Sequence, residues 1–425
     1  MATLETINYQ RKRADLRESE VVWANADDKE GIPLPQICWA DGSPWREPNL
    51  WATQRCELRT ITRKTIISTM THLHAYAKWL ESEQIAWFHF PAREQDRCLI
   101  RFRGFLVALV DRGELAPSTA QQRMARVIRF YRWAVISGLI ASDWPMWTDK
   151  AVGVRLVDKF GLERTMSVES TNLSIPNKKS SFTKLEDGLI PVPAAEVPNI
   201  ITAAEEWASE ELSLLIQLGF GTGMRIGTLI DLRVATISRA TPSPTLEGFY
   251  CLAVGPGAHP PVATKFGVTG QVLINKGDLE KLKSYIYSGR RLKRVALARK
   301  ENSNLVFLSR FGAPYATIDG AKSINVELGR LRSKGLSEGI YAFSGFHFHR
   351  TRCTFATELA RAALKHLTVS DAITLVKGAL LHKDEKTTLG YIKFIESHAE
   401  MSALANEFTR KFLGIMRIDE QNYGE

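Results

Sequence analysis

A polar, turn-rich stretch at residues 170–188 divides this 425-residue chain into two parts, each of which must bury its own apolar residues. The stretch reads STNLSIPNKKSSFTKLEDG, and its serines, lysines, proline and glycine are typical of a linker. A chain of this length corresponds to roughly two to three domains. We therefore expect a linker at 147–189, which could include short strands near its start, between a helical domain at 59–146 and a larger domain at 190–425.

The first domain is predicted from apolar residues that recur at helical spacing. Five of them follow one another at intervals of four, three, four and three: Ile66, Met70, Leu73, Ala77 and Leu80. This spacing places them on one face of a helix. The same pattern predicts a second helix through residues 99–109. A third helix is expected to begin at Pro117, with Ser118 and Gln121 as a capping box, and to end at Gly138.

The third predicted helix carries an arginine at every third position. These arginines are Arg123, Arg126, Arg129 and Arg132. Such a stripe is either a solvated face or a surface that lies along a phosphate backbone. The whole chain has 56 Lys and Arg against 46 Asp and Glu, a formal charge of +10. This balance favours a polyanionic partner such as nucleic acid.

The regions that flank this domain are predicted to differ from it. Residues 1–58 combine a charged start with a segment rich in proline and tryptophan, and we interpret them as an N-terminal arm that packs against something. The larger domain is mostly helical, with strand-like segments at 249–255, 262–267 and 271–274 broken by Gly and Pro. The expected fold class is therefore mainly α with a small antiparallel β-sheet (α+β).

Several classes of protein are excluded by composition. The five cysteines are scattered without a Cys-x-x-Cys pair, which argues against a disulfide scaffold and a cysteine-rich zinc site and indicates a reducing cytosol. The N-terminus lacks the apolar core of a secretion signal, and apolar stretches such as 105–110 are too short to span a bilayer. We expect a cytoplasmic protein without a membrane partner.

Two segments of the larger domain hold cationic groups suited to a phosphodiester. In 221–232, GTGMRIGTLIDL, a glycine turn precedes a helix that opens with Arg225. A guanidinium held there can bind phosphate oxygens, although it could also pair with an acid. In 346–360, His349 and Arg352 lie three residues apart at a helix start, so both project from one face. Taken alone, this second segment could equally be a capped basic turn.

A third segment, residues 380–394, brings a possible nucleophile. Here His382 precedes Tyr391 by nine residues, across a turn that contains two lysines and the pair Thr387-Thr388. A single tyrosine is usually a packing residue, so this segment alone is weak evidence for catalysis. A second basic run, RRLKRVALARK at 290–300, is either a solvated helix or a DNA contact.

Together, the order and spacing of these segments resemble the tyrosine recombinase (phage integrase) family. The matching residues are Thr222-Gly223-Met224-Arg225, His349-Arg350-Thr351-Arg352 with Cys353-Thr354-Phe355-Ala356-Thr357, Leu380-Leu381-His382, and Tyr391. The family's β-hairpin lysine resembles Lys265, with Lys276 as a rival eleven residues later. Leu381 replaces the usual Gly, Cys353 the frequent His and Thr228 the frequent Glu; we expect these departures to alter local packing only.

The resemblance implies a helical core-binding domain at 59–146 and a catalytic domain at 190–425 that ends in a tail helix, within which residues 401–415 are amphipathic. It implies a site-specific DNA recombinase of a mobile element, nucleoid-associated, that cleaves and rejoins strands through a 3′-phosphotyrosyl intermediate. The implied partners are double-stranded DNA at specific recombination sites, further copies of the chain (a dimer on one site, a tetramer in synapsis) and possible accessory DNA-binding proteins.

Each matching residue has an implied role. Tyr391 is the nucleophile, and His349 takes its proton. Arg225, Arg352 and His382 stabilise the phosphate, and Lys265 protonates the leaving oxygen; these six are the candidate catalytic residues. No metal or cofactor is implied, because cationic side chains neutralise the charge and no Asp/Glu cluster resembles a two-metal nuclease site. The alternatives are a type IB topoisomerase-like DNA relaxation enzyme and a catalytically silent DNA-binding protein.

Overall fold

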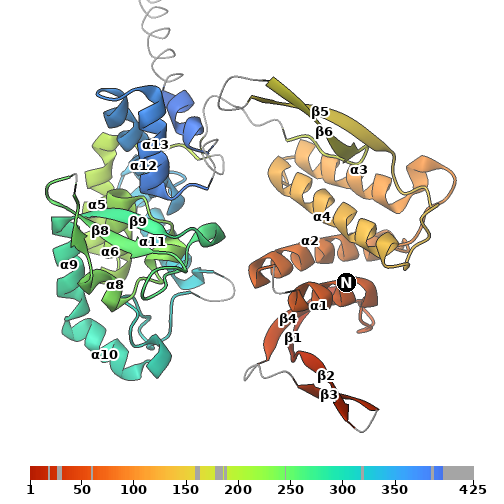
Figure 1. Cartoon of the computed structure of the whole chain (residues 1–425). Coiled ribbons are helices and arrows are strands. Elements are labelled where there is room, and N and C mark those ends of the chain that lie inside the picture. The colour runs from red at the N-terminus through yellow and green to blue at the C-terminus, as the bar shows by residue number, and fades with distance from the viewer. Residues whose placement is uncertain are drawn as a thin grey trace, which may run out of the picture. The chain divides into compact units, whose positions relative to one another are not determined.

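The computed structural model describes residues 1–17, 20–25, 31–58, 61–157, 163–177, 185, 189–244, 246–316, 320–383 and 387–395. The chain divides into two compact units, Met1–Lys178 and Lys179–Glu425 (Figure 1). The predicted fold class is confirmed, since both units are mainly helical and their sheets are small and antiparallel. None of the described helices is long and apolar enough to cross a membrane.

The first unit combines two-stranded sheets with a helical core. Its elements are β1 (Thr3–Tyr9), β2 (Lys12–Arg17), β3 (Glu20–Asn25), β4 (Ile32–Cys38), α1 (Arg46–Glu57), α2 (Arg63–Ser82), α3 (Cys98–Asp111), α4 (Pro117–Ile136), β5 (Asp149–Val157) and β6 (Glu163–Thr171). Helices α2, α3 and α4 are the three that apolar spacing predicted. The predicted capping box of α4 is wrong, because Ala116 is the N-cap and no side chain caps the helix.

The N-terminal segment packs into the same core as these helices. Trp45 is 1% exposed, and its ring lies 5.6 Å from that of Phe130 on α4. Asn49 fastens β4 to α1, because its side chain accepts from the Ile37 amide at 2.8 Å and donates to the Ile37 carbonyl at 3.0 Å. The sequence predicted an arm that packs against something, and in the structure this segment packs on the helices of the first unit, where Trp45 lies in an aromatic core.

Part of the stretch that was predicted as a linker also has regular structure. Strands β5 and β6 pair antiparallel, with Asp149 opposite Thr171 and Val157 opposite Glu163. Beyond this hairpin, Leu173 is fully buried in the core of the first unit. Most of the polar remainder, 178–184 and 186–188, lies outside the described residues, as does the predicted amphipathic tail at 401–415.

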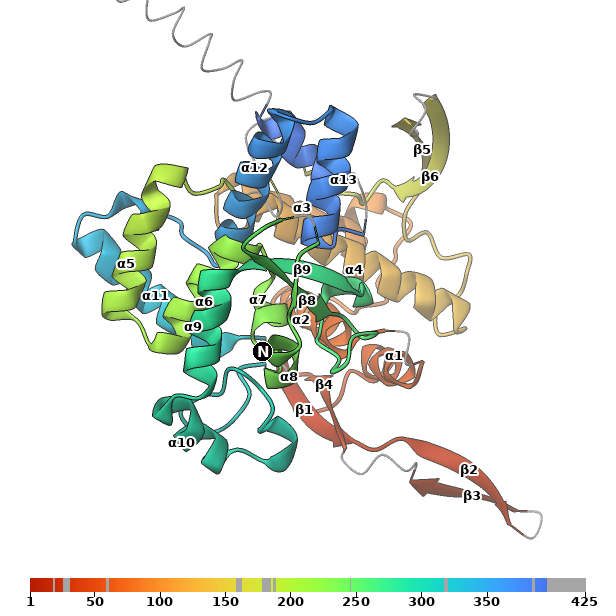
Figure 2. The same ribbon diagram turned by 60° about the vertical axis from the view of Figure 1, so that its left-hand side comes forward.

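In the second unit, helices pack against a three-stranded sheet. Its elements are α5 (Val197–Trp207), α6 (Glu210–Thr222), α7 (Ile226–Leu229), α8 (Val234–Ser238), β7 (Thr241–Pro242), β8 (Phe249–Val254), β9 (Gly270–Asn275), α9 (Lys276–Ile286), α10 (Gly289–Leu297), α11 (Lys322–Ser337), α12 (His349–Leu364) and α13 (Val369–Leu380). The strand order is β7-β8-β9. Helices α12 and α13 lie beside each other, with α13 packed near β9 (Figure 2).

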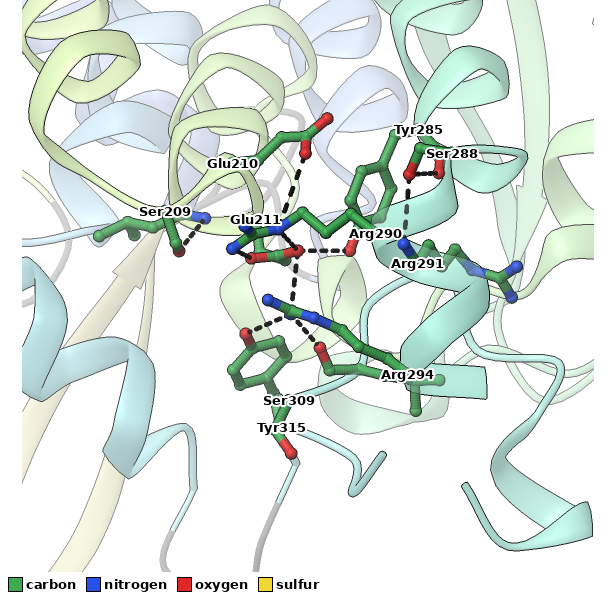
Figure 3. A network of polar contacts seen from close by, with 12 residues as sticks. Ser209, Glu210, Glu211, Tyr285, Ser288, Arg290, Arg291, Arg294, Ser309 and Tyr315 are labelled. Carbon is green, nitrogen blue, oxygen red and sulfur yellow. Dashed lines mark hydrogen bonds and ion pairs between the residues drawn. The ribbon is translucent and has the colours of Figure 1, made fainter. Parts of the chain in front are cut away.

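The basic run at 290–300 turns much of its charge inward, which neither sequence interpretation anticipated. Glu211 on α6 is fully buried and receives two hydrogen bonds from the Arg290 guanidinium, at 2.8 and 2.9 Å (Figure 3). Arg294 also reaches Glu211, at 2.9 Å, and Arg291 donates to backbone carbonyls such as that of Leu305. These three arginines hold α10 in place, because a buried charge needs partners of this kind.

Candidate active site

A glycine turn after α6 sets the direction of Arg225. Gly223 caps α6 in the left-handed conformation, with φ of +66°, which favours glycine. A Cβ here would lie 2.5 Å from Phe355 Cδ1 and 2.8 Å from Leu380 Cδ2, so α12 and α13 can approach only a residue without a side chain. The chain then reverses, and Arg225 becomes the N-cap residue of α7.

Arg352 ties this turn to α12 and α13. The side chain projects from α12 and only 2% of the residue is exposed. Its Nη1 donates to the Gly223 carbonyl at 2.7 Å and its Nη2 donates to the Leu380 carbonyl at 3.0 Å. Carbonyls at helix C-termini lack helical partners and carry partial negative charge, so a buried guanidinium stabilises both helix ends. Arg352 therefore fixes how the segments around Arg225 and His382 approach each other.

Arg225, Arg352 and Lys265 line one cavity of about 20 Å³. They come from three separate segments: the α7 N-cap, α12, and a 3-10 turn between β8 and β9. This turn, Lys265–Gly267, lies in the segment 262–267, which was predicted as strand-like; within it Val262 forms an isolated β-bridge with Gly255. The cavity has room for about one water molecule. The rival lysine, Lys276, is the first residue of α9 and does not line the cavity.

His382 follows Leu381, the C-cap residue of α13, and lies beside Tyr391. Its Nδ1 is 2.9 Å from Thr388 Oγ1, and its ring stacks on that of Tyr391 with centroids 6.1 Å apart and planes 11° apart. Tyr391 is fully buried in a small core between α12 and α13, and its hydroxyl donates to Cys353 Sγ at 4.0 Å. The tyrosine ring is thus adjacent to the histidine, while its hydroxyl faces a thiol.

His349 is the first residue of α12 and is half-buried. It precedes Arg352 by three residues on this helix, as the sequence spacing predicted, which places both on one face. It does not line the cavity that contains Arg352. The structure therefore gathers Arg225, Lys265 and Arg352 in one cavity, pairs His382 with Tyr391, and leaves His349 on the helix face shared with Arg352.

The departures from the family pattern occupy packing positions. Leu381 caps α13 with φ of +51°, a left-handed conformation that is costly for leucine. It packs closely on β9, because a Cβ at Gly270 would lie 2.4 Å from Leu381 Cδ2. Thr228 and Leu381 both line the cavity, and Cys353 contacts the Tyr391 hydroxyl. These substitutions therefore touch the site directly, beyond the local packing that the sequence suggested.

A cluster of basic side chains lies on the first unit, separate from this cavity. Arg126 and Arg129 lie close together on α4. Partial burial lowers the pKa of Arg126, and the positive charge of Arg129 lowers it further. Burial and the charges of these two also lower the pKa of Arg55 on α1. Burial, Arg123 and Arg126 lower the pKa of His72 on α2. The sequence missed Arg55 and His72, because only the packing of α1 and α2 on α4 brings them to the stripe.

The last arginine of the stripe has a different environment. Arg132 lies 3.6 Å from Asp149, at the start of β5. Together with Arg126 and Arg129 it lines a groove of about 360 Å³ that also includes Ser170 of β6. The groove therefore contains three guanidinium groups, one of which also pairs with the exposed Asp149. Among the residues that the structure describes, no group of three or more His, Cys, Asp or Glu side chains is placed to hold a metal ion.

Residues 192–394 match the model of the phage integrase family. In fold, the chain resembles the Tn1549 transposon integrase solved with a circular intermediate DNA, with 14% identity, a TM-score of 0.51, and coverage of 84% of this chain and 98% of that chain. It also resembles the XerH site-specific recombinase bound to difH substrate (17% identity, TM-score 0.46, 79% and 78% covered) and a lambda integrase dimer bound to a COC′ core site (16%, 0.45, 81% and 75%). No curated protein sequence matches the chain.

Proposed function

We propose, from the premise that residues 192–394 are a phage integrase domain, that this chain is a site-specific DNA recombinase. The observation that carries the proposal is the cavity shared by Arg225, Lys265 and Arg352, which Arg352 links to the segment of His382 and Tyr391. Two guanidinium groups and an ammonium group that converge from three segments suit a reacting phosphodiester. The substrate is double-stranded DNA at a specific site.

In the proposed reaction, Tyr391 Oη attacks the scissile phosphorus and the 5′-oxygen leaves, which gives a 3′-phosphotyrosyl bond and a free 5′-hydroxyl. His349 accepts the tyrosine proton, and Lys265 donates a proton to the leaving oxygen. Arg225, Arg352 and His382 bind the non-bridging oxygens, where each donor contributes about 3 kcal/mol to transition-state stabilisation. Because the phosphoryl bond is kept as an ester, a 5′-hydroxyl from a partner strand can reverse the step and no ATP is needed.

The described conformation needs a movement of the tyrosine before cleavage. The Tyr391 hydroxyl faces Cys353 in a buried core. We infer that DNA binding moves the segment 387–395 so that the hydroxyl reaches the phosphorus. The buried tyrosine would then be protected from reaction until DNA is bound.

We assign binding of the DNA backbone to the basic stripe of α4. Arg123, Arg126, Arg129 and Arg132 are proposed to contact the phosphate backbone, which supplies affinity rather than sequence choice. Two copies of the chain would bind one site, and four would assemble in synapsis, where accessory DNA-binding proteins could take part. The recombinase would serve a mobile element and associate with the nucleoid.

The test is covalent trapping. Purified protein is incubated in EDTA with duplexes from the DNA that flanks its own gene, some carrying a nick near the cleavage point, and is quenched with SDS. The wild type is expected to form a protein–DNA adduct and Tyr391→Phe none. Tyr341→Phe is the matched control, because Tyr341 is 85% exposed and lies outside the site.

The same assay separates the alternatives. A recombinase joins the cleaved strand to a second duplex that carries the same site, whereas a topoisomerase-like enzyme only reseals the original strand. Firm DNA binding without an adduct on nicked duplexes would instead indicate a catalytically silent DNA-binding protein and would contradict the proposal.

A further inference from the structure

Asp231 connects the two sides of the basic cavity. It lies in the turn after α7, six residues beyond Arg225. Its Oδ2 accepts a hydrogen bond from the backbone amide of Ala263 at 2.7 Å. Ala263 precedes Lys265 by two residues in the loop between β8 and β9. The carboxylate thus joins the segment that carries Arg225 to the loop that carries Lys265.

The side of this contact that carries Asp231 is held firmly by backbone hydrogen bonds. The Asp231 amide donates to the Thr228 carbonyl at 3.2 Å, and the next residue, Leu232, accepts from the Val306 amide at 2.9 Å. Arg233 Nη2 donates to Asp231 Oδ1 at 2.9 Å, which leaves Oδ2 directed to the loop. The Asp231 side chain is 20% exposed, whereas Ala263, which donates to it, lies at the surface.

The loop side has a tight turn at Lys265. Phe266 and Gly267 both have left-handed backbones, with φ of +67° and +66°. The Gly267 amide donates to the Thr264 carbonyl at 3.2 Å, and Thr264 Oγ1 donates to the Val268 carbonyl at 2.6 Å. These bonds fix the shape of the turn but join it only to itself. The bond from Ala263 to Asp231 joins the turn to the wall of the cavity.

The chemistry of Asp231 suits this task. A carboxylate accepting from a backbone amide forms a charge-assisted hydrogen bond, which is about twice as strong as a neutral one. Lys265 itself is exposed, and its flexible stem leaves many positions open to the ammonium group. Restricting its backbone reduces the volume that the ammonium group samples, and proton transfer depends steeply on such placement.

We propose that Asp231 is a positioning residue that holds the Lys265 loop against the cavity wall, so that the lysine reaches the leaving 5′-oxygen. The inference rests on the proposed function. In the step concerned, the bond between phosphorus and the 5′-oxygen breaks with its electron pair going to oxygen, and a proton passes from the Lys265 ammonium to that oxygen. Asp231 takes no part in the transfer; it acts through the backbone of Ala263.

The first test needs no DNA. Hydrogen exchange of the loop peptide 255–269 is compared in the full-length wild type, Asp231→Ala and Asp231→Asn. The alanine variant is expected to exchange at least about 5-fold faster at the Ala263 amide, because its acceptor is lost. The asparagine variant keeps one oxygen and should lie between the two. Glu280→Ala is the matched control, since Glu280 forms an exposed pair with Lys283 on α9. In this variant the loop 255–269 should exchange as in the wild type.

The second test measures single-turnover cleavage on the duplex that the wild type cleaves. Asp231→Ala is expected to slow adduct formation about 10-fold while DNA affinity stays within about 2-fold, and Asp231→Asn should recover part of the rate. Lys265→Ala should be slower still. A duplex with sulfur at the 5′-bridging position separates positioning from general damage, because a thiolate leaves without a proton. On it, Asp231→Ala and Lys265→Ala should both come within about 3-fold of the wild type.

Each outcome has a distinct meaning. Loss of rate in Asp231→Ala that the sulfur substrate restores supports the inference. Wild-type rates with the oxygen substrate, or a defect that the sulfur substrate leaves unchanged, would overturn it while the recombinase proposal stands. Absence of an adduct in the wild type would overturn the proposed function. The inference would then fall too, even if the exchange data confirm the hydrogen bond between Asp231 and the Ala263 amide.

Discussion

The hydroxyl of Tyr391 donates a hydrogen bond to the Sγ of Cys353, which holds the proposed nucleophile in a core between α12 and α13. Replacing Cys353 by alanine removes this acceptor, and the loss destabilises only the conformation in which the tyrosine is buried. Losing this hydrogen bond costs the buried position about 1 kcal/mol, so the reactive position becomes relatively more accessible. We expect Cys353→Ala to form the covalent DNA adduct about 5-fold faster in single turnover.

Cys251→Ala provides the control for that prediction. Cys251 is also buried in the second unit, on β8, and is not part of the Tyr391 core. Its alanine variant should lose stability without gaining cleavage rate. If both alanine variants cleave at equal rates, the thiol does not restrain the tyrosine.

The two candidate lysines are expected to differ sharply in function. Lys265 lines the cavity with the arginines, whereas Lys276 opens α9 outside it. A positioned general acid contributes about 10² to 10⁴ in rate, so Lys265→Ala should slow cleavage roughly 100-fold. Lys276→Ala should stay within about 2-fold of the wild type. The measurement is the rate of adduct formation at saturating DNA, and a reversed order would move the role to Lys276.

The arginines of α4 should contribute unequally to DNA affinity. Arg129 is exposed beside Arg126, while Arg132 already lies 3.6 Å from Asp149. Each phosphate contact adds about 0.9 to the slope of log affinity against log salt. Arg129→Ala should therefore lower the slope by about 1, and Arg132→Ala by less. Fluorescence anisotropy with a labelled duplex over a salt series checks this, with the exposed Arg112→Ala as control; equal slopes for all three would contradict it.

Much of the fold and the site followed from local sequence pattern. Apolar spacing predicted α2, α3 and α4, because an amphipathic helix records its buried face in its own sequence. Motif order predicted that Arg225 and Arg352 belong together, and the structure places them around one cavity. These inferences succeeded because each depends on neighbours within a few residues or on a resemblance in motif order.

The remainder depended on contacts between distant segments. Asp231 lies within a motif but acquires its partner 32 residues later, at Ala263. The basic run at 290–300 resembled a surface because its buried counter-charge, Glu211, lies about 80 residues earlier. The orientation of the Tyr391 hydroxyl toward Cys353 likewise depends on how two helices pack. None of these pairings has a periodic signature in the sequence.

Gly223 should tolerate no side chain. An alanine there would adopt a left-handed backbone and would press on Phe355 and Leu380. The backbone costs about 1 to 2 kcal/mol and the overpacking about 1 to 3, so Gly223→Ala should destabilise the chain by roughly 2 to 5 kcal/mol. Gly227→Ala is the matched control, because that position in α7 has open space, and alanine there should be neutral or slightly stabilising. Urea unfolding of the two variants checks the contrast; equal midpoints would contradict it.

Glu211 should make the stability of the second unit depend on pH. Burial alone would raise the pKa of this carboxyl, but hydrogen bonds from Arg290 and Tyr285 and the charge of Arg294 hold it below its ordinary value of 4.5. The depressed pKa means that its stabilisation is complete above about pH 4.5 and is lost as the pH falls through the folded-state pKa.

A variant tests this pH dependence. Breaking one partner of a buried ion pair costs about 3 to 5 kcal/mol, so Glu211→Gln should lose about that much free energy of unfolding at pH 7. The difference in free energy of unfolding between Glu211→Gln and the wild type should narrow below pH 4.5 in urea titrations. Glu205→Gln, which alters an exposed pair with Lys281, should show no such gap. A gap for Glu211→Gln that stays constant down to pH 3 would mean that lost packing, rather than lost charge, causes the effect.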